Sequence, residues 1–218
     1  MSAARDAAAR KELVAAIQRL DALGLNRGST GNASARVAGG MLITPTGAGA
    51  DTLRADDLVI VADDGAVSGA WQPSSEWHFH RAIYRARPDV SAVVHTHSTH
   101  ATALACQRRG LPAFHYMVAI TGAASVPCVP YHTFGTEALS SAVIDGLRSG
   151  NACLLANHGL VTCGATIATA LKIALEVESL CESYLASLVL GEPARLDDDE
   201  MARVIAKFRT YGRSARRS

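Results

Sequence analysis

Two histidines spaced two residues apart, His95 and His97, stand in the apolar run Ser91-Ala-Val-Val-His-Thr-His-Ser98. Side chains alternate between the two faces of a strand, so residues two apart point the same way and can converge on one ion. A metal site is one interpretation of the pair. The other is two partly solvated histidines at a strand end, which is the better reading of a His-x-His pair without further ligands. Additional ligand residues would decide between them.

Two further residues supply such ligands. His158 lies in Leu154-Leu-Ala-Asn-His-Gly159, where an apolar strand breaks at a glycine, and Glu76 ends the run Pro73-Ser-Ser-Glu76 at the mouth of an expected helix. Taken singly, His158 fits a structural turn and Glu76 fits an acid that answers the helix macrodipole. Three imidazoles and one carboxylate together suit zinc or a similar divalent ion. The combination therefore favours a metal site.

The other histidines compete poorly as ligands. His78 and His80 are two apart on an expected helix, which separates them by about 200° and prevents joint chelation. His80 is four residues from Glu76 on the same face, so we expect it to support or pack near the site. The last three offer no ligand geometry or simply begin a helix: His100, His115 and His132.

Three short segments rich in glycine and hydroxyl groups indicate an anion site: Gly28-Ser-Thr-Gly-Asn32, Thr44-Pro-Thr-Gly47 and Ser74-Ser75. Glycine lets the backbone approach a ligand, hydroxyls and Asn donate hydrogen bonds, and a helix N-terminus favours negative charge. Each segment alone is more typical of a turn or a cap. None matches a dinucleotide or P-loop motif, so no nucleotide is implied. The two serines adjoin Glu76, which links a phosphate site to the metal site.

Composition narrows the function classes. The chain has 218 residues, 49% hydrophobic and 19% charged, which suits one domain with a sizeable core. Its formal net charge of +1 gives no electrostatic footprint for nucleic acid. Five cysteines without a C-x-x-C pair, and no secretory h-region, favour a reducing cytoplasm. The longest apolar stretch, residues 167–190, carries internal charges, so we expect no membrane span.

Hydrophobic periodicity and turn signals predict the elements that must position these residues. Helices are expected at residues 3–23, from Ser74 or Ser75 as cap to about 86, at 99–108, at 167–190 and from an acidic start at 197–200. Strands are expected at 33–37, 41–44, 58–62, 67–68, 91–97, 114–120, 126–129, 152–156 and 160–162. The sum is an α/β fold with a sheet of about seven or more strands between helices.

In its motifs the chain resembles the class II aldolase and adducin family, and within it the bacterial L-fuculose-1-phosphate aldolase group. The motifs run in family order over nearly the whole chain: Gly24-Leu-Asn-Arg-Gly-Ser-Thr-Gly-Asn-Ala-Ser34, Met41-Leu-Ile-Thr-Pro-Thr-Gly47, Pro73-Ser-Ser-Glu-Trp77, Ala92-Val-Val-His-Thr-His97, His115-Tyr-Met117, Pro127-Cys-Val-Pro-Tyr131, Thr133-Phe-Gly-Thr136, Asn157-His-Gly-Leu160 and Lys207-Phe-Arg-Thr-Tyr-Gly212. The resemblance implies a single domain over residues 1–212, with a central, mostly antiparallel sheet packed between helices, followed by a basic tail at 213–218. It also implies a cytoplasmic homotetramer with active sites between subunits.

The resemblance also implies roles for particular residues. Glu76, His95, His97 and His158 would be the ligands of one Zn²⁺ per subunit. The substrate phosphate would be held by Ser29, Asn32, Thr46, Gly47, Ser74 and Ser75. Tyr116 matches the catalytic tyrosine of the family, and Phe134 and Tyr211 match residues that a neighbouring subunit contributes.

The implied reaction is reversible cleavage of a ketose 1-phosphate, with L-fuculose 1-phosphate as first candidate, to dihydroxyacetone phosphate and a small aldehyde such as L-lactaldehyde. Glu76 would move a proton at the nucleophilic carbon, and Tyr116 would do so at the aldehyde-side oxygen. The related 4-epimerases carry aspartate in place of Glu76, so glutamate favours aldol cleavage.

Two alternatives stay open. Ser29 and Asn157 stand where the aldolases often have threonine and histidine, which leaves room for another lyase, a decarboxylase or a 4-epimerase acting on a phosphorylated sugar or sugar acid. A non-catalytic adducin-like interaction module is a further alternative. The four ligand residues argue against it, because such modules usually lose them.

Overall fold

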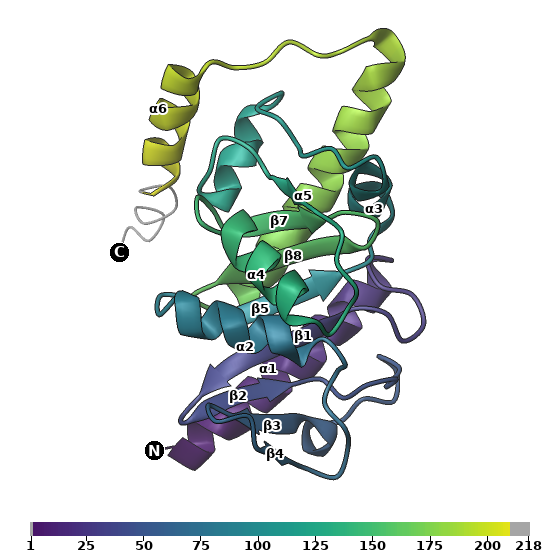
Figure 1. The fold of residues 1–218 in the computed structure, drawn as a ribbon, viewed down its shortest axis with the longest axis vertical. Helices are drawn as coiled ribbons and strands as arrows, with labels where there is room; N and C mark the ends of the chain where they lie inside the picture. The colour runs from purple at the N-terminus through teal and green to yellow at the C-terminus, as the bar shows by residue number, and fades with distance from the viewer. Residues whose placement is uncertain (1, 210–218) are drawn as a thin grey trace, which may run out of the picture.

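The computed structural model describes residues 2–209 (Figure 1). Tyr211 and the expected tail at 213–218 lie outside the described residues. In chain order the elements are α1 (Ser2–Ala22), β1 (Asn32–Val37), β2 (Gly40–Ile43), η1 (Ala55–Asp57), β3 (Val59–Ala62), β4 (Val67–Ser68), α2 (Trp77–Ala86), β5 (Ala92–Thr96), α3 (Thr99–Cys106), η2 (Tyr116–Thr121), β6 (Cys128–Val129), α4 (Glu137–Gly146), β7 (Ala152–Leu155), β8 (Gly159–Gly164), α5 (Ile167–Ser187), η3 (Leu188–Leu190) and α6 (Asp198–Phe208), where η marks a 3₁₀-helix.

The strands form one eight-stranded sheet in the order β4-β3-β2-β1-β5-β8-β7-β6. Every neighbouring pair is antiparallel except β6 and β7, which run parallel. The expected α/β fold with a mostly antiparallel central sheet is therefore confirmed. Strand β5 lies in the middle, with His95 opposite Asn32 of β1 on one side and opposite Val161 of β8 on the other.

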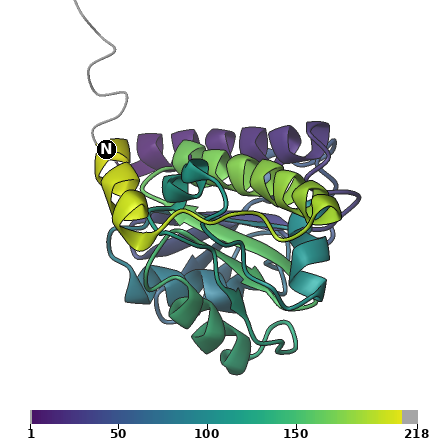
Figure 2. The same cartoon turned by 90° about the horizontal axis from the view of Figure 1, so that it is seen from above.

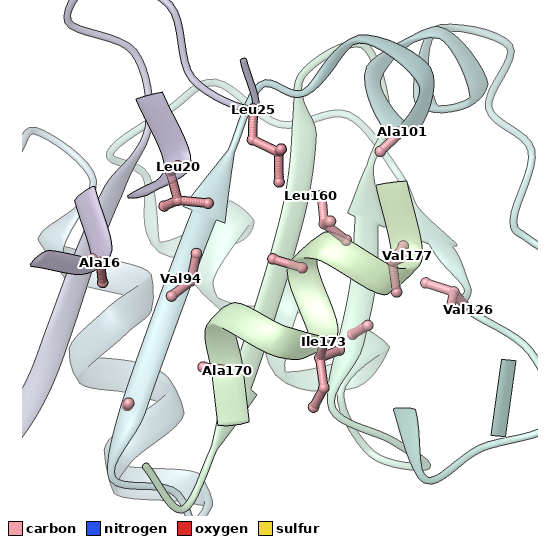
Figure 3. Close-up of a cluster of buried hydrophobic side chains, with 14 of the residues drawn as sticks. Ala16, Leu20, Leu25, Val94, Ala101, Val126, Leu160, Ala170, Ile173 and Val177 are labelled. Carbon is pink, nitrogen blue, oxygen red and sulfur yellow. The ribbon is translucent and has the colours of Figure 1, made fainter. Parts of the chain in front are cut away.

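Helices cover both faces of this sheet, as Figure 2 shows with α1 and α5 on one side and α2 and α4 on the other. Alternation along β5 sends Val94 into the larger core, under α1 and α5, and Val93 into the smaller core, under α2. Figure 3 shows Val94 of β5 among side chains of α1 and α5 such as Leu20 and Ile173. His95 is two residues from Val93 and so faces α2, the helix that follows Glu76.

Two expected elements differ from the structure, one in its type and the other in the residue that caps it. The segment 114–120 was predicted as a strand but forms the 3₁₀-helix η2, because the His115 ring accepts a hydrogen bond from the Met117 N–H and Gly122, at φ 84°, ends the turn. Helix α2 is capped by neither serine. Its N-cap residue is Glu76, and Ser74 Oγ accepts the Glu76 N–H at 3.3 Å instead.

Helix α4, at Glu137–Gly146, was not predicted from the sequence. The boundaries of the other expected elements fall close to their expected places. The long C-terminal helix ends at Ser187 and continues as the 3₁₀-turn η3, and Asp197 caps α6 by accepting the Glu200 N–H at 2.7 Å. Of the helices described here, none is long and apolar enough to span a bilayer.

Candidate metal centre and substrate cavity

Four side chains from separate parts of the chain meet at one end of the central strands. His95 is the last residue but one of β5, His97 follows that strand, His158 lies in the β7–β8 turn, and Glu76 precedes α2. One potential ligand atom from each lies within 4.8 Å of all the others. The structure thus brings together the four residues expected to hold a metal.

The mutual geometry of these groups is tight. His95 Nε2 lies 2.9 Å from His97 Nε2 and 3.2 Å from Glu76 Oε2, and His158 Nε2 lies 3.0 Å from Glu76 Oε1. The three rings meet edge to face with centroids 4.8 to 4.9 Å apart. Each imidazole therefore turns one ring nitrogen toward a shared centre.

The hydrogen-bond pattern around His95 shows that a cation fits that centre. Its Nδ1 lies 2.9 Å from the Leu160 carbonyl oxygen, which can only accept, so Nδ1 carries the proton. Despite burial, the Glu76 carboxylate raises the pKa of His95, so without a metal the Nε2 atom can also carry a proton, which it donates to that carboxylate. A bound cation would take the place of this proton and face the Nε2 lone pair of a neutral ring. Histidine ligands of metals are commonly oriented by a carbonyl in this way. Acceptors that face one another in a buried site are stabilised by a bound cation.

The electrostatics at Glu76 and His97 favour the protonation states that bind a cation. Burial opposes ionisation of Glu76, but His95 and His158 outweigh it and hold the carboxyl pKa well below its usual range. Burial, together with His95 and His158, lowers the pKa of His97 to about 4. A neutral imidazole and an ionised carboxylate are the protonation states that ligation requires.

The β7–β8 turn is built to present His158 beside β5. Asn157 has a positive φ of 55°, and the His158 N–H donates to the Leu155 carbonyl at 3.0 Å. At Gly159 a Cβ atom would lie 2.4 Å from the Thr96 carbonyl oxygen and 3.1 Å from the His97 ring. Only glycine lets β8 approach the histidine strand this closely.

A cavity of about 380 Å³ opens from the metal centre. Its walls include Glu76, His97, His158 and all six residues expected to bind phosphate, which come from the loop before β1, the loop after β2 and the segment before α2. The lining is Ser29, Thr30, Gly31, Asn32, Pro45, Thr46, Gly47, Ser74, Ser75, Glu76, His97, Tyr131, His132, Phe134, Asn157 and His158. A cavity of this size suits a small organic ligand.

Two aromatic residues occupy places that the sequence did not indicate. Tyr116, the expected catalytic acid, is half-exposed on η2 and lines a separate hollow formed with α6 rather than the metal cavity. Phe134, expected to serve a neighbouring subunit, lines the cavity of its own chain. The fold of η2 makes Tyr116 share a hollow with residues of α5 and α6, whereas the loop before α4 makes Phe134 share the metal cavity with Ser75 and His132.

Sequence reasoning missed part of the site. His80 is fully buried in contact with Asn32, in keeping with its expected supporting place, but its partners Ser34 and Tyr84 were not singled out. Their signal was weak, because a serine in a strand and a tyrosine in an amphipathic helix are ordinary residues there. His132 lines the cavity although its sequence context gave no hint of it.

A sequence profile described as "Class II Aldolase and Adducin N-terminal domain" matches residues 11–185. The chain belongs to the class II aldolase and adducin family. It is 47% identical over 208 residues to the 5-methylthioribulose-1-phosphate/5-deoxyribulose-1-phosphate aldolase of Rhodospirillum rubrum, covering 95% of this chain and 94% of that protein. It is 44% identical over 203 residues to the L-fuculose phosphate aldolase of Escherichia coli K12, covering 93% and 94%.

Solved structures agree with this membership. An L-fuculose 1-phosphate aldolase superposes with a TM-score of 0.89 at 35% identity, over 92% of this chain and 96% of that one. This class II aldolase is therefore a metal-dependent lyase of the fuculose-phosphate and methylthioribulose-phosphate type, and its family requires a divalent metal.

Proposed function

We propose that this class II aldolase cleaves a ketose 1-phosphate reversibly to dihydroxyacetone phosphate and a small aldehyde. The observation that carries the proposal is one cavity in which a Glu/His₃ cluster and a hydroxyl-rich, glycine-containing wall lie side by side. A phosphate at one end of a short sugar can reach that wall while the carbonyl of the same molecule reaches the cluster.

The phosphate is held by Ser29, Asn32, Thr46, Gly47, Ser74 and Ser75. The hydroxyls and the Asn32 amide donate hydrogen bonds, and the positive φ of 71° at Gly47 exposes backbone to the ligand. Ser74 and Ser75 lie just before α2, where the helix N-terminus favours an anion. This wall orients the substrate and adds nothing to the bond-breaking step itself.

Glu76, His95, His97 and His158 hold the divalent ion, for which we propose Zn²⁺ because three imidazoles and a carboxylate are a common zinc set. When bound, the ion supplies Lewis-acid stabilisation of the negative charge left when the carbon–carbon bond breaks. Glu76, turned away from the centre, exchanges a proton with the nucleophilic carbon of the dihydroxyacetone phosphate half. The side chain is long enough to serve both positions.

Tyr116 supplies the proton exchange at the aldehyde-side oxygen, and it does so for a neighbouring subunit. The family resemblance supports the catalytic role, and the place of Tyr116 outside the cavity of its own chain supports its use by a neighbour. We propose a homotetramer in which η2 of one subunit faces the cavity of the next, with Tyr211 contributing from the same neighbour and Phe134 from the cavity's own chain.

The aldehyde end of the substrate is proposed to be short and apolar. Tyr131 and Phe134 line the cavity and are 54% and 62% exposed, so they can pack on a methyl-bearing group. L-Fuculose 1-phosphate, which would give L-lactaldehyde, fits this description. The R. rubrum relative supports 5-methylthioribulose 1-phosphate as a second candidate.

A coupled assay for dihydroxyacetone phosphate over a panel of ketose 1-phosphates tests the proposal. We expect release from at least one of the two candidate substrates and no release from the matching ketoses without phosphate. Turnover of the unphosphorylated sugars at the same rate would contradict the phosphate wall. Epimerised sugar without cleavage would replace the aldolase proposal with that of a 4-epimerase.

A further inference from the structure

A chain of buried hydrogen bonds leads away from the metal centre through the smaller core. Asn32 Nδ2 lies 2.9 Å from Glu76 Oε2, and Asn32 Oδ1 lies 2.5 Å from His80 Nε2. Beyond the ring, His80 Nδ1 lies 2.7 Å from Ser34 Oγ, which lies 2.8 Å from the Tyr84 hydroxyl oxygen. All five side chains are buried, so water cannot substitute for a lost partner at low cost.

The direction of every bond in this chain follows from its first member. An ionised carboxylate can only accept, so Asn32 must turn its NH₂ group to Glu76 and its carbonyl oxygen to His80. His80 must then carry its proton on Nε2 and leave Nδ1 to accept from the Ser34 hydroxyl. Because the Ser34 hydroxyl donates its proton to His80 Nδ1, the Tyr84 hydroxyl donates to Ser34 Oγ.

The reverse arrangement is strongly disfavoured. If the Asn32 amide turned over, its oxygen would face the Glu76 carboxylate, and its NH₂ group would face the Nε2–H of His80. Two acceptors would meet on one side and two donors on the other, in a buried site. The Nε2–H of His80 and the carboxylate of Glu76 therefore hold the Asn32 amide from opposite sides, and only one orientation of the amide satisfies both.

Neighbouring side chains hold the Tyr84 end of this hydrogen-bond chain in place. The Arg36 guanidinium lies 4.9 Å from the Tyr84 ring centroid and donates to the backbone carbonyls of Tyr84, Val90 and Arg87 at 2.7 to 3.0 Å. The His80 ring stacks on Phe79 with centroids 4.5 Å apart. Burial lowers the pKa of His80 to about 3, which keeps the ring neutral.

We infer that His80 is a positioning residue, which donates from Nε2 to Asn32 and so fixes the Asn32 NH₂ group toward Glu76 and the phosphate end of the cavity. Through Asn32 it sets the direction of the Glu76 carboxylate. One Asn32 N–H is used on Glu76, and the second is directed at the cavity for the ligand. The inference rests on the proposed function for the identity of that ligand, but the orientation of Asn32 does not depend on it.

The tautomer of His80 tests the inference without substrate. Nitrogen NMR of the imidazoles in protein labelled at histidine distinguishes a ring protonated on Nε2 from one protonated on Nδ1. We expect a neutral His80 with its proton on Nε2, both before and after Zn²⁺ is added. A proton on Nδ1, or a charged ring at neutral pH, would overturn the inference even if the enzyme cleaves ketose 1-phosphates.

A double-mutant cycle tests whether His80 acts through Asn32. Zn²⁺ affinity, measured by competition with a chelating dye, is expected to fall by about 10-fold in His80→Phe, which is the scale for partners that orient metal ligands. Asn32→Ala should weaken binding comparably, and the double variant should be no weaker than the worse single variant. Additive losses would show that His80 acts independently of Asn32 and would overturn the inference.

Two further variants separate positioning from packing. His80→Gln places an amide donor near the lost Nε2–H and should recover most of the Zn²⁺ affinity that His80→Phe loses. Ile83→Val removes one methylene from the same buried face of α2 and changes no member of the hydrogen-bond chain, so it should leave Zn²⁺ affinity unchanged. A loss in Ile83→Val equal to that in His80→Phe would assign the effect to helix packing. Failure of the sugar assay alone would contradict the proposed function and leave these results standing.

Discussion

Glu76 is proposed to serve both metal binding and proton transfer. Its oxygens lie 3.0 and 3.2 Å from imidazole nitrogens of His158 and His95, and the carboxylate also lies in the wall of the cavity. Because the same group is proposed to bind the ion and to move a proton, a change that removes its basicity but keeps its shape should separate the two tasks.

We expect Glu76→Gln to lower kcat for cleavage by about 10² to 10⁴-fold, the usual contribution of a positioned general base. The measurement is the steady-state rate of dihydroxyacetone phosphate formation together with the metal content of the protein. Glu178→Gln is the matched control, because Glu178 also pairs with a histidine, His100 at 2.9 Å, and accepts backbone N–H groups at the start of α3. That variant should lose thermal stability and keep kcat. Wild-type kcat in Glu76→Gln would remove the proton-transfer role.

The buried neutral His80 predicts a pH dependence of stability. Desolvation lowers its pKa from 6.5 to about 3, with a further contribution from His95 and an opposing one from Glu76. As the pH falls below 6.5, the unfolded chain takes up a proton that the folded chain refuses, so the folded state loses stability. The loss approaches about 1.4 kcal/mol per pH unit for this one group.

Urea unfolding of the metal-free protein between about pH 7 and about pH 5 measures that slope. His80→Phe should show a shallower decline than the wild type, whatever its absolute stability, because the group responsible is gone. Equal slopes would mean that His80 is protonated in the folded state.

At the scale of the residue, the sequence indicated the ligand cluster through one local pair, and it added Glu76 and His158 as candidate ligands by their residue types and their places at the ends of elements. His95 and His97 share a strand face by period alone, and glycine after His158 marks a strand end. The hydrogen-bond chain was out of reach, because Ser34, His80 and Tyr84 are brought together only when α2 packs across β1. Nothing in the sequence around Ser34 distinguishes it from any strand serine.

The loop between α1 and β1 shows how an element shapes the phosphate wall. Gly31 has a φ of 74°, and a Cβ atom there would lie 2.3 Å from the buried Asn26 amide. Gly28 in the same loop has a φ of 65°, but a Cβ atom there would meet nothing within 4 Å. The two glycines share a left-handed backbone and differ only in what surrounds them.

We therefore expect Gly31→Ala to raise KM for the ketose 1-phosphate more than it lowers kcat, and to cost more stability than Gly28→Ala. The Gly28 variant carries the backbone penalty alone, about 1 kcal/mol, whereas Gly31→Ala must also displace Asn26 from its buried place. Steady-state kinetics and thermal unfolding of both variants make the measurement. Equal effects on KM would show that the close approach to Asn26 does not shape the wall.

Most elements were predictable, because their apolar periodicity agrees with the face that they bury. One exception is η2, whose residues favour β-structure but pair with no strand among residues 2–209, so local capping by His115 determined its form. The start of α2 also differs from the prediction, because Ser74 and Ser75 line the cavity and Glu76 is the N-cap residue. Helix α4 was missed altogether, although Thr136 caps it and Leu139 and Val143 lie four residues apart on its buried face.

At the scale of the whole molecule, the separation of Tyr116 from the cavity of its own chain requires an assembly if that residue takes part in the reaction. The sequence could not reveal this, because motif order along a chain carries no information about which subunit completes a site. Mixed oligomers provide a direct test.

Co-expression of Glu76→Gln with Tyr116→Phe subunits should restore activity that neither variant has alone. In a cyclic tetramer of random composition, about one quarter of the cavities combine an intact Glu76 with an intact Tyr116 from the neighbour. Activity in purified mixed oligomers is compared with the sum of the two single variants, measured at equal concentration. Activity no greater than that sum would place Tyr116 outside the neighbour's site.

The central claim is that the Glu/His₃ cluster and the phosphate wall form one metal-dependent site for carbon–carbon cleavage. Its most direct test is the rate at which dihydroxyacetone phosphate is released from L-fuculose 1-phosphate and 5-methylthioribulose 1-phosphate by protein stripped of metal and then reloaded with Zn²⁺. We predict that release is lost on stripping, returns with one equivalent of Zn²⁺ per subunit, and does not return in His95→Ala. Unchanged release from the stripped protein would contradict the account.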